Sequence, residues 1–154
     1  MHLDTDFSTS TTRVILKERA EKAGHTVVEK KIVKDDEDEL VEQLNAWCDD
    51  ENIQVILATG GSGVTARDVT PEAVERVAQK KIPGFGELFR QLSYDDIATS
   101  TIQSRATAAV KNKTYIFCLP GSTGACRDGW DKMLVHQLDM RTRPCNFAEL
   151  IARL

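Results

Sequence analysis

Apolar residues form several unbroken runs along the chain, and these runs predict strands. Ile53–Ala58 is apolar throughout, and Thr114–Leu119 (TYIFCL) is a second such run. Runs of this kind are typical of strands that are covered on both faces. The segment His25–Val33 is rich in β-branched residues and predicts a third strand.

Segments with helical spacing of apolar residues lie between and around these strands. The pattern predicts helices over residues 13–23, 35–48, 71–79, 87–92 and 128–138. The first is expected to end at Gly24, and the third to have Thr70 as its N-cap and Pro71 at its first helical position. Strands that alternate with helices predict one α/β domain over residues 1–154, with a parallel sheet covered by helices.

The start of the chain departs from this pattern. A doubly wound sheet usually begins with a buried strand, whereas MHLDTDFSTSTT is polar and typical of a turn. Two alternatives follow: the sheet starts at His25–Val33, or a first strand is missing from this chain.

Composition narrows the class of protein. With 41% apolar and 29% charged residues, a net charge of −4 and a pI near 5.4, the chain resembles ordinary globular proteins, and its charge gives no support to nucleic-acid binding. No apolar run approaches the roughly 20 residues that span a bilayer, so no membrane segment is expected. The cysteines lack the CxxC spacing of zinc sites, and we interpret them as reduced thiols of a cytoplasmic protein. They are Cys48, Cys118, Cys126 and Cys145.

A glycine-rich loop, Thr59–Gly63 (TGGSG), directly follows the predicted strand Ile53–Ala58. Successive backbone N–H groups in such a turn can surround an anion, and the hydroxyls of Thr59, Ser62 and Thr65 add donors. The loop matches neither the P-loop nor the dinucleotide-binding fingerprint. From the loop alone, a phosphate site and a tight strand-to-helix turn remain equal alternatives.

Further polar groups are expected at the same edge of the sheet. The turn Pro120–Ser122 also follows an apolar strand, and the carboxyl ends of parallel strands meet at one edge. Asp68 follows the glycine loop, and Asp35 follows the predicted strand His25–Val33. Two carboxylates beside an anion site suit Mg²⁺-assisted phosphoryl or nucleotidyl transfer, although Asp68 could equally belong to an ordinary helix start.

These segments together resemble the MoaB/MogA family of molybdenum cofactor biosynthesis proteins, over about His25 to Phe147. The resemblance is carried by TGGSG at 59–63, RDVTPEA at 67–73, PGFGE at 83–87, SR at 104–105 and LPGS at 119–122. The segments STGACR at 122–127, QLD at 137–139 and RTRPCNF at 141–147 resemble the MoaB branch in particular. Ser62 stands where the family commonly has threonine, and the family's opening strand has no counterpart here.

The resemblance implies a three-layer α/β/α fold with a mostly parallel sheet, the molybdopterin-binding fold, assembled as a trimer or a dimer of trimers. It implies binding of molybdopterin and, in active members, adenylation of its terminal phosphate by Mg-ATP. Carried over to this chain, the catalytic and Mg²⁺-binding residues are Asp68 and Asp35. The residues expected to bind phosphate and pterin groups are Thr59, Gly60, Gly61, Ser62, Gly63, Thr65, Glu87, Ser104, Arg105, Pro120, Gly121 and Ser122.

Two alternatives to an adenylyltransferase remain. The chain could bind molybdopterin without using ATP, or it could be an interaction module whose glycines serve turns alone. In the interaction-module case, Trp130, Leu134 and Leu138 of the last predicted helix, with the basic segment 141–143, would form an oligomer interface.

Overall fold

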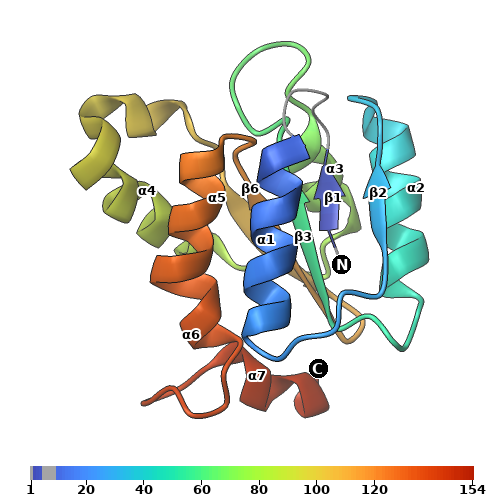
Figure 1. The fold of residues 1–154 in the computed structure, drawn as a ribbon. Coiled ribbons are helices and arrows are strands. Elements are labelled where there is room, and N and C mark those ends of the chain that lie inside the picture. Colours follow the sequence, from blue (N-terminus) through green and yellow to red (C-terminus); the bar gives the residue numbers. More distant parts are fainter. Residues whose placement is uncertain (1, 5–9) are drawn as a thin grey trace.

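A six-stranded sheet lies between two layers of helices in the computed structural model, which describes residues 2–4 and 10–154 (Figure 1). The strands are β1 (His2–Asp4), β2 (Lys30–Ile32), β3 (Val55–Thr59), β4 (Lys80–Lys81), β5 (Thr107–Lys111) and β6 (Thr114–Leu119). Their order across the sheet is β2-β1-β3-β6-β5-β4. The four strands β2, β1, β3 and β6 are parallel, whereas β5 pairs antiparallel with both β6 and β4. The predicted α/β fold with a mostly parallel central sheet is confirmed.

Helices connect most of the strands, whereas β5 leads directly into β6. They are α1 (Ser10–Lys22), α2 (Glu37–Cys48), α3 (Thr70–Val77), α4 (Pro83–Ile97), α5 (Thr123–Gly129), α6 (Val135–Gln137) and α7 (Phe147–Leu150). Shorter helical turns are η1 (Ala98–Gln103), η2 (Trp130–Leu134, a π-helical turn) and η3 (Ile151–Arg153). No helix in the described ranges 2–4 and 10–154 has both the length and the apolar character that crossing a membrane requires.

The prediction that the first strand is missing was wrong. β1 lies inside the sheet, where His2 is opposite Lys30 of β2 and Leu57 of β3. This strand has only three residues, and β2 is equally short. The predicted strand His25–Val33 is therefore a strand only at its end, because its preceding residues have no described neighbour to pair with.

Side chains alternate between the two faces of the sheet and form two cores. One core joins β3 and β6 to α2 and α3, and includes Leu40, Leu44, Ile56, Ala58, Val74, Ile116 and Cys118. The other joins the opposite face to α1, α4 and α5, and includes Leu16, Leu57, Phe85, Phe89, Phe117, Leu119 and Trp130. The unbroken apolar strands of the sequence are thus explained by burial on both faces.

Several helix boundaries differ from those predicted. α3 already includes Thr70, so Thr70 is not its N-cap, and its hydroxyl is buried without a hydrogen-bond partner among the described residues. α4 is longer than the predicted 87–92, and the last helical stretch begins at Thr123 rather than 128. The proposed interface residues of this stretch, Trp130, Leu134 and Leu138, are all buried in the core. The interaction-module hypothesis therefore loses the apolar surface on which it depended.

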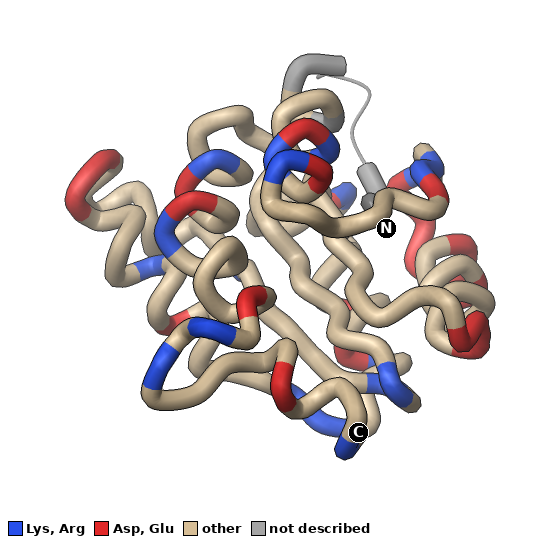
Figure 2. Tube along the Cα trace, turned by 60° about the horizontal axis from the view of Figure 1, so that its bottom comes forward, with Lys and Arg blue, Asp and Glu red and all other residues tan. Residues whose placement is uncertain are grey.

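Charged residues are distributed over many elements, with a local concentration of acidic residues on α2 (Figure 2). The first turn of α2 contains Glu37, Asp38 and Glu39, and Asp36 caps the helix by accepting a hydrogen bond from the Glu39 N–H at 2.9 Å. Acidic side chains at this end complement the helix dipole. Arg76 of α3 pairs with Glu37 and Asp38, at 3.0 and 2.8 Å, and joins the two helices at the surface. The acidic run thus serves the helix and its packing.

Candidate functional site

The two predicted glycine turns meet at the carboxyl edge of the parallel strands. Gly60 and Gly61 have positive φ angles of 87° and 62°, a conformation that disfavours other residues. The N–H of Gly60 donates to the carbonyl oxygen of Leu119 at 3.0 Å, so the loop after β3 is tied to the end of β6. A Cβ at Gly121 would lie 3.1 Å from the Cα of Gly60. Glycine is required here because two backbones touch.

Asp68 closes the far end of the glycine loop. Its Oδ2 accepts hydrogen bonds from the N–H and the hydroxyl of Thr65, at 2.8 and 2.7 Å. A Cβ at Gly63 would lie 2.8 Å from this oxygen, so the carboxylate fits only against glycine. Partial burial raises the pKa of Asp68, but hydrogen bonds from Thr65 and Gly63 and the charge of Arg105 lower it more, so the pKa lies below its ordinary value. The Asp68 side chain is thus a fixed, ionised carboxylate at neutral pH.

Arg105 holds the glycine loop in place through hydrogen bonds to its backbone. Its backbone N–H donates to the Ser62 carbonyl at 2.9 Å, and its Nε donates to the Gly63 carbonyl at 2.6 Å. One terminal nitrogen donates to the carbonyl of Asp68 at 2.7 Å, and the guanidinium also pairs with the carboxylate of Glu72. Since these contacts occupy the donors of its guanidinium group, Arg105 is a positioning residue for the loop. The ion pair with Glu72 raises the pKa of Arg105.

Asp35 is brought beside the same loop by an ion pair. Arg67 lies 3.2 Å from Asp35 Oδ2, and the Asp35 side chain is only 20% exposed. Arg67 precedes Asp68 in sequence, so the loops that carry the two predicted carboxylates are neighbours. Carboxylate oxygens are ligands that Mg²⁺ prefers, so this pair suits the ion chemically. No group of three or more potential metal ligands occurs in the described part of the chain, so water and substrate oxygens would have to complete such a shell.

A cavity of about 490 Å³ opens between the two glycine turns and α4. Five of the predicted binding residues line it, namely Ser62, Gly63, Ser104, Pro120 and Ser122. Apolar walls come from Phe89 and Ile97, and the basic side chain of Arg127 also contributes. An apolar wall, hydroxyl groups and one guanidinium form a suitable surface for a flat ring that carries an anionic group.

Two carboxylates that the sequence analysis did not identify face each other at this cavity. Lys132 lies 2.8 Å from Asp96 of α4 and 3.3 Å from Asp128 of α5. Burial and a hydrogen bond with Asp96 raise the pKa of Asp128, whereas Lys132 lowers the pKa of Asp96. The two acids therefore differ in their readiness to ionise, and the pair links the two helices across the cavity.

The remaining predicted residues lie outside this cavity. Thr59 is fully buried at the end of β3. The Thr65 hydroxyl donates a hydrogen bond to the Asp68 carboxylate. Glu87 is exposed near the start of α4, just after its first turn, and is absent from the cavity lining, to which Phe89 and later residues of this helix contribute. The structure thus brings together most of the predicted residues but does not bring Glu87 to them.

Only some of the residues that the sequence analysis did not identify had a local signal. Arg127 follows the Pro120–Ser122 turn by one helical turn and could have been found from that position. Asp96 is separated from both turns in sequence, and so is Glu72 from Arg105. Only the fold brings these groups together.

Comparison with known proteins finds a matching family model and close relatives of this chain. A family model described as "Probable molybdopterin binding domain" matches residues 5–140. The molybdenum cofactor biosynthesis protein B of Escherichia coli K12 is 51% identical over 132 residues, covering 86% of this chain and 78% of that protein. The protein of the same name from Bacillus subtilis 168 is 44% identical over 119 residues, covering 77% and 70%.

Solved structures agree with these sequence matches. A crystal structure of molybdenum cofactor biosynthesis protein B superposes with a TM-score of 0.84 at 38% identity, covering 89% of this chain and 88% of the other. The molybdopterin biosynthesis Mog protein from Mycobacterium ulcerans gives a TM-score of 0.83 at 27% identity, with 99% and 95% covered. The fold of this chain therefore recurs in both solved structures.

Proposed function

Because this chain belongs to the family of molybdopterin-binding domains, among the molybdenum cofactor biosynthesis proteins B (MoaB), we propose that it binds molybdopterin and adenylates its terminal phosphate with Mg-ATP. The observation that carries this proposal is the meeting of the two glycine turns beside a cavity that contains Arg127. The pterin would lie against the apolar wall of Phe89 and Ile97, with its phosphate toward the turns and Arg127.

In the proposed reaction, an oxygen of the molybdopterin phosphate attacks the α-phosphorus of ATP. The bond from this phosphorus to the bridging oxygen of the β-phosphate breaks, and pyrophosphate leaves with the electron pair. Mg²⁺, when bound, would neutralise charge on the phosphates. Asp68 and Asp35 are the carboxylates that would hold it. The backbone N–H groups of the loop would orient the reacting phosphate, and Arg105 would keep the loop in its shape.

Pyrophosphate release tests the enzymatic part of the proposal. The purified protein with molybdopterin, Mg²⁺ and ATP should release pyrophosphate, and the Asp68→Asn variant should lose at least 99% of this activity while it still binds the pterin. Asp50→Asn, in the turn between α2 and β3, is the matched control and should keep the activity, because this carboxylate also accepts a backbone hydrogen bond but lies away from the cavity. Absence of pyrophosphate release from the unchanged protein, with the pterin bound, would exclude the adenylyltransferase.

A second candidate function is molybdopterin binding without ATP chemistry. The ion pair between Arg67 and Asp35 favours it, because a guanidinium at 3.2 Å already neutralises one of the two carboxylates proposed for Mg²⁺. Calorimetry distinguishes the two functions: heat from molybdopterin but none from Mg-ATP would support the binding protein. Heat from both, together with pyrophosphate release, would support the enzyme.

We also propose that the protein forms a homo-oligomer, a trimer or a dimer of trimers. Exposed apolar side chains on and beside α4 support this, namely Leu88, Tyr94, Ile97 and Ile102, which are 44 to 78% exposed in the single chain. Sedimentation equilibrium measures the assembly directly, and a monomer at micromolar concentration would contradict it.

A further inference from the structure

An exposed arginine, Arg67, joins the loop that carries Asp68 to the carboxylate of Asp35. Asp35 follows β2 and Arg67 follows β3, and β1 lies between these two strands in the sheet (Figure 1). The guanidinium of Arg67 donates a hydrogen bond to Asp35 Oδ2 at 3.2 Å. This ion pair therefore crosses the carboxyl edge of the parallel strands, beside both of the carboxylates that we propose for Mg²⁺.

The protein holds Arg67 far more loosely than it holds Arg105. The Arg67 side chain is 85% exposed, and Asp35 is its one hydrogen-bond partner within residues 2–4 and 10–154. The Arg105 side chain is 34% exposed and binds two backbone carbonyls of the loop as well as the carboxylate of Glu72. Because an exposed ion pair contributes little to folding, Arg67 can leave Asp35 without disturbing the fold.

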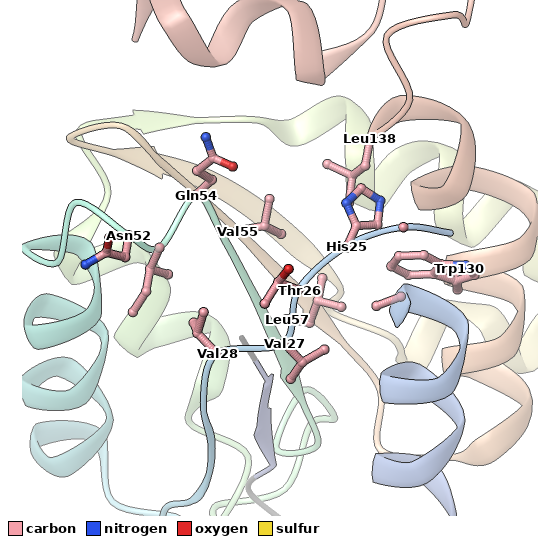
Figure 3. Close-up of a pocket in the computed structure, with 13 residues that line it drawn as sticks. His25, Thr26, Val27, Val28, Asn52, Gln54, Val55, Leu57, Trp130 and Leu138 are labelled. Carbon is pink, nitrogen blue, oxygen red and sulfur yellow. The ribbon is translucent and has the colours of Figure 1, made fainter. Parts of the chain in front are cut away.

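A cavity at the amino-terminal end of β3 is no alternative place for the phosphates of ATP (Figure 3). Its volume is about 320 Å³, and its lining includes Gln54 and Val55 beside the start of β3, with His25 and Trp130 opposite. The described residues that line it include no aspartate, glutamate, lysine or arginine. Since a triphosphate with Mg²⁺ needs charged partners, the carboxyl edge of the sheet suits it better.

A divalent cation and Arg67 compete for the same carboxylate. Mg²⁺ binds carboxylate oxygens directly and carries twice the charge of a guanidinium group, and two cations at one carboxylate repel each other. Asp35 therefore releases Arg67 when it takes up the ion.

The charges at this edge indicate which group the released arginine would meet. Asp35 and Asp68 together offset both charges of Mg²⁺, so the β- and γ-phosphates of ATP still need positive partners. Arg127 lines the cavity proposed for molybdopterin, and Arg105 is engaged by Glu72. The guanidinium of Arg67 has donors in a planar fork that fits phosphate oxygens, and it starts from a position beside the proposed metal ligands.

We propose that Arg67 is an exchangeable counter-ion, which neutralises Asp35 in the ligand-free protein and binds the β- and γ-phosphates of ATP once Asp35 takes up Mg²⁺. This inference rests on the proposed adenylyltransferase and names a residue that binds its nucleotide. The two phosphates become the pyrophosphate that leaves, so a guanidinium group on them also offsets the charge that develops on the leaving group. The ion pair with Asp35 is then the resting state of an enzyme.

Binding measurements on the Arg67→Gln variant test this role without any turnover. One probe is Mn²⁺ alone, followed by electron paramagnetic resonance, and the other is the Mg²⁺ complex of α,β-methylene ATP, which cannot transfer AMP. The variant should bind Mn²⁺ about threefold or more tighter, because a competitor of the metal is lost. It should bind the ATP analogue about tenfold or more weaker, because donors to the phosphates are lost. AMP lacks these phosphates and should bind both proteins equally well.

Arg76→Gln is the matched control, because it removes the same charge from another ion pair at the surface. Arg76 is in the last turn of α3 and pairs with Glu37 and Asp38, away from the glycine loop. This variant should change neither affinity. Arg67→Lys should bind Mn²⁺ like the unchanged protein and should recover only part of the affinity for the analogue, because an ammonium group lacks the planar fork.

Several results would overturn the inference. Weaker binding of both probes by Arg67→Gln would mean that Arg67 only supports the loop, and unchanged binding of both would mean that it has no part in the site. Tighter Mn²⁺ binding with unchanged binding of the analogue would exclude the contact with phosphate. Failure of the unchanged protein to bind the analogue would overturn the adenylyltransferase and this inference with it, whereas the other results leave the adenylyltransferase standing.

Discussion

Arg105 contacts the backbone of the glycine loop, whereas Arg127 lines the cavity beside it. Arg105 faces inward and donates to the carbonyls of Gly63 and Asp68, while Arg127 is an exposed side chain at the edge of the cavity. A guanidinium can hold two carbonyls and a carboxylate at once because its donors form a rigid fork, which an ammonium group lacks. The same residue type can therefore support the loop at one position and contact a ligand at another.

The Arg105→Lys variant should therefore lose stability, by about 1 to 2 kcal/mol of unfolding free energy, because two or more charge-assisted hydrogen bonds to the loop are lost. Arg127→Lys should leave unfolding unchanged within about 0.5 kcal/mol and should weaken binding of molybdopterin several-fold. Urea unfolding and calorimetry measure the two effects. A reversed result, with Arg127 affecting only stability, would contradict the roles assigned to both residues.

The lowered pKa of Asp68 gives its hydrogen bonds a defined pH dependence. Above about pH 3.9, where an unfolded aspartate is ionised, the bonds from Thr65 contribute fully to stability. As the pH falls through this value the unfolded state takes up a proton first, and the contribution is lost once the pH passes below the folded pKa. Asp68→Asn should thus be less stable than the unchanged chain at pH 7, by about 1 kcal/mol or less, and the difference should shrink as the pH falls below about 4. Thermal unfolding across this range measures it, and a constant difference would contradict the assignment.

At the scale of elements, helix α5 packs on β6 through a glycine. A Cβ at Gly129 would lie 2.6 Å from a methyl group of Leu119, whereas a Cβ at Gly124 of the same helix would meet nothing within 4 Å. Gly129→Ala should destabilise the fold by about 1 to 3 kcal/mol through overpacking. Gly124→Ala should be neutral or stabilising, because alanine favours the helix. Chemical unfolding of the two variants measures this, and equal effects would mean that helix propensity outweighs the contact.

Some strands could be predicted from the sequence, and others could not. Ile53–Ala58 and Thr114–Leu119 were predicted as buried strands because their apolar runs are a local signal. The structure confirms both: β6 has the predicted bounds, and β3 is shifted slightly to Val55–Thr59. The segment β5, with the sequence TAAVK, was missed because two alanines carry no strand preference and antiparallel pairing with β6 decides its conformation. The strand expected over His25–Val33 is short because its neighbour β1 has three residues. Strand length here depends on pairing, which no local pattern records.

Some residues of the candidate site could likewise be predicted from the sequence, and others could not. Its glycines and Asp68 were found because backbone approach and positive φ require particular residue types at fixed spacing. The pairing of Arg105 with Glu72 joins residues from different elements, and so does that of Lys132 with Asp96. Such contacts follow from the order of strands and helices, so they could be identified only once the fold was known.

At the scale of the whole molecule, the two cores on either side of the sheet determine which thiols can react. No disulfide joins the four cysteines, and Cys48, Cys118 and Cys126 are buried whereas Cys145 is exposed. Burial raises the pKa of Cys48 to about 11 and that of Cys118 to about 12. Since the thiolate is the reactive form, low ionisation and inaccessibility both protect the buried groups.

An aromatic disulfide reagent at pH 8 should therefore modify one thiol per chain quickly and the other three only as the protein unfolds. Cys145→Ser should remove the fast phase and leave the slow one unchanged, which assigns the fast phase to that residue. Burial keeps the Cys48 thiol protonated at this pH, so its modification requires the surrounding packing to open. Because Cys48 lies in the core with α2 and α3, and Cys126 in the core with α1 and α4, unequal slow rates would show that one layer opens without the other. Equal rates that match global unfolding would show that the two layers open together, whereas fast modification of two or more thiols in the native protein would contradict the described packing.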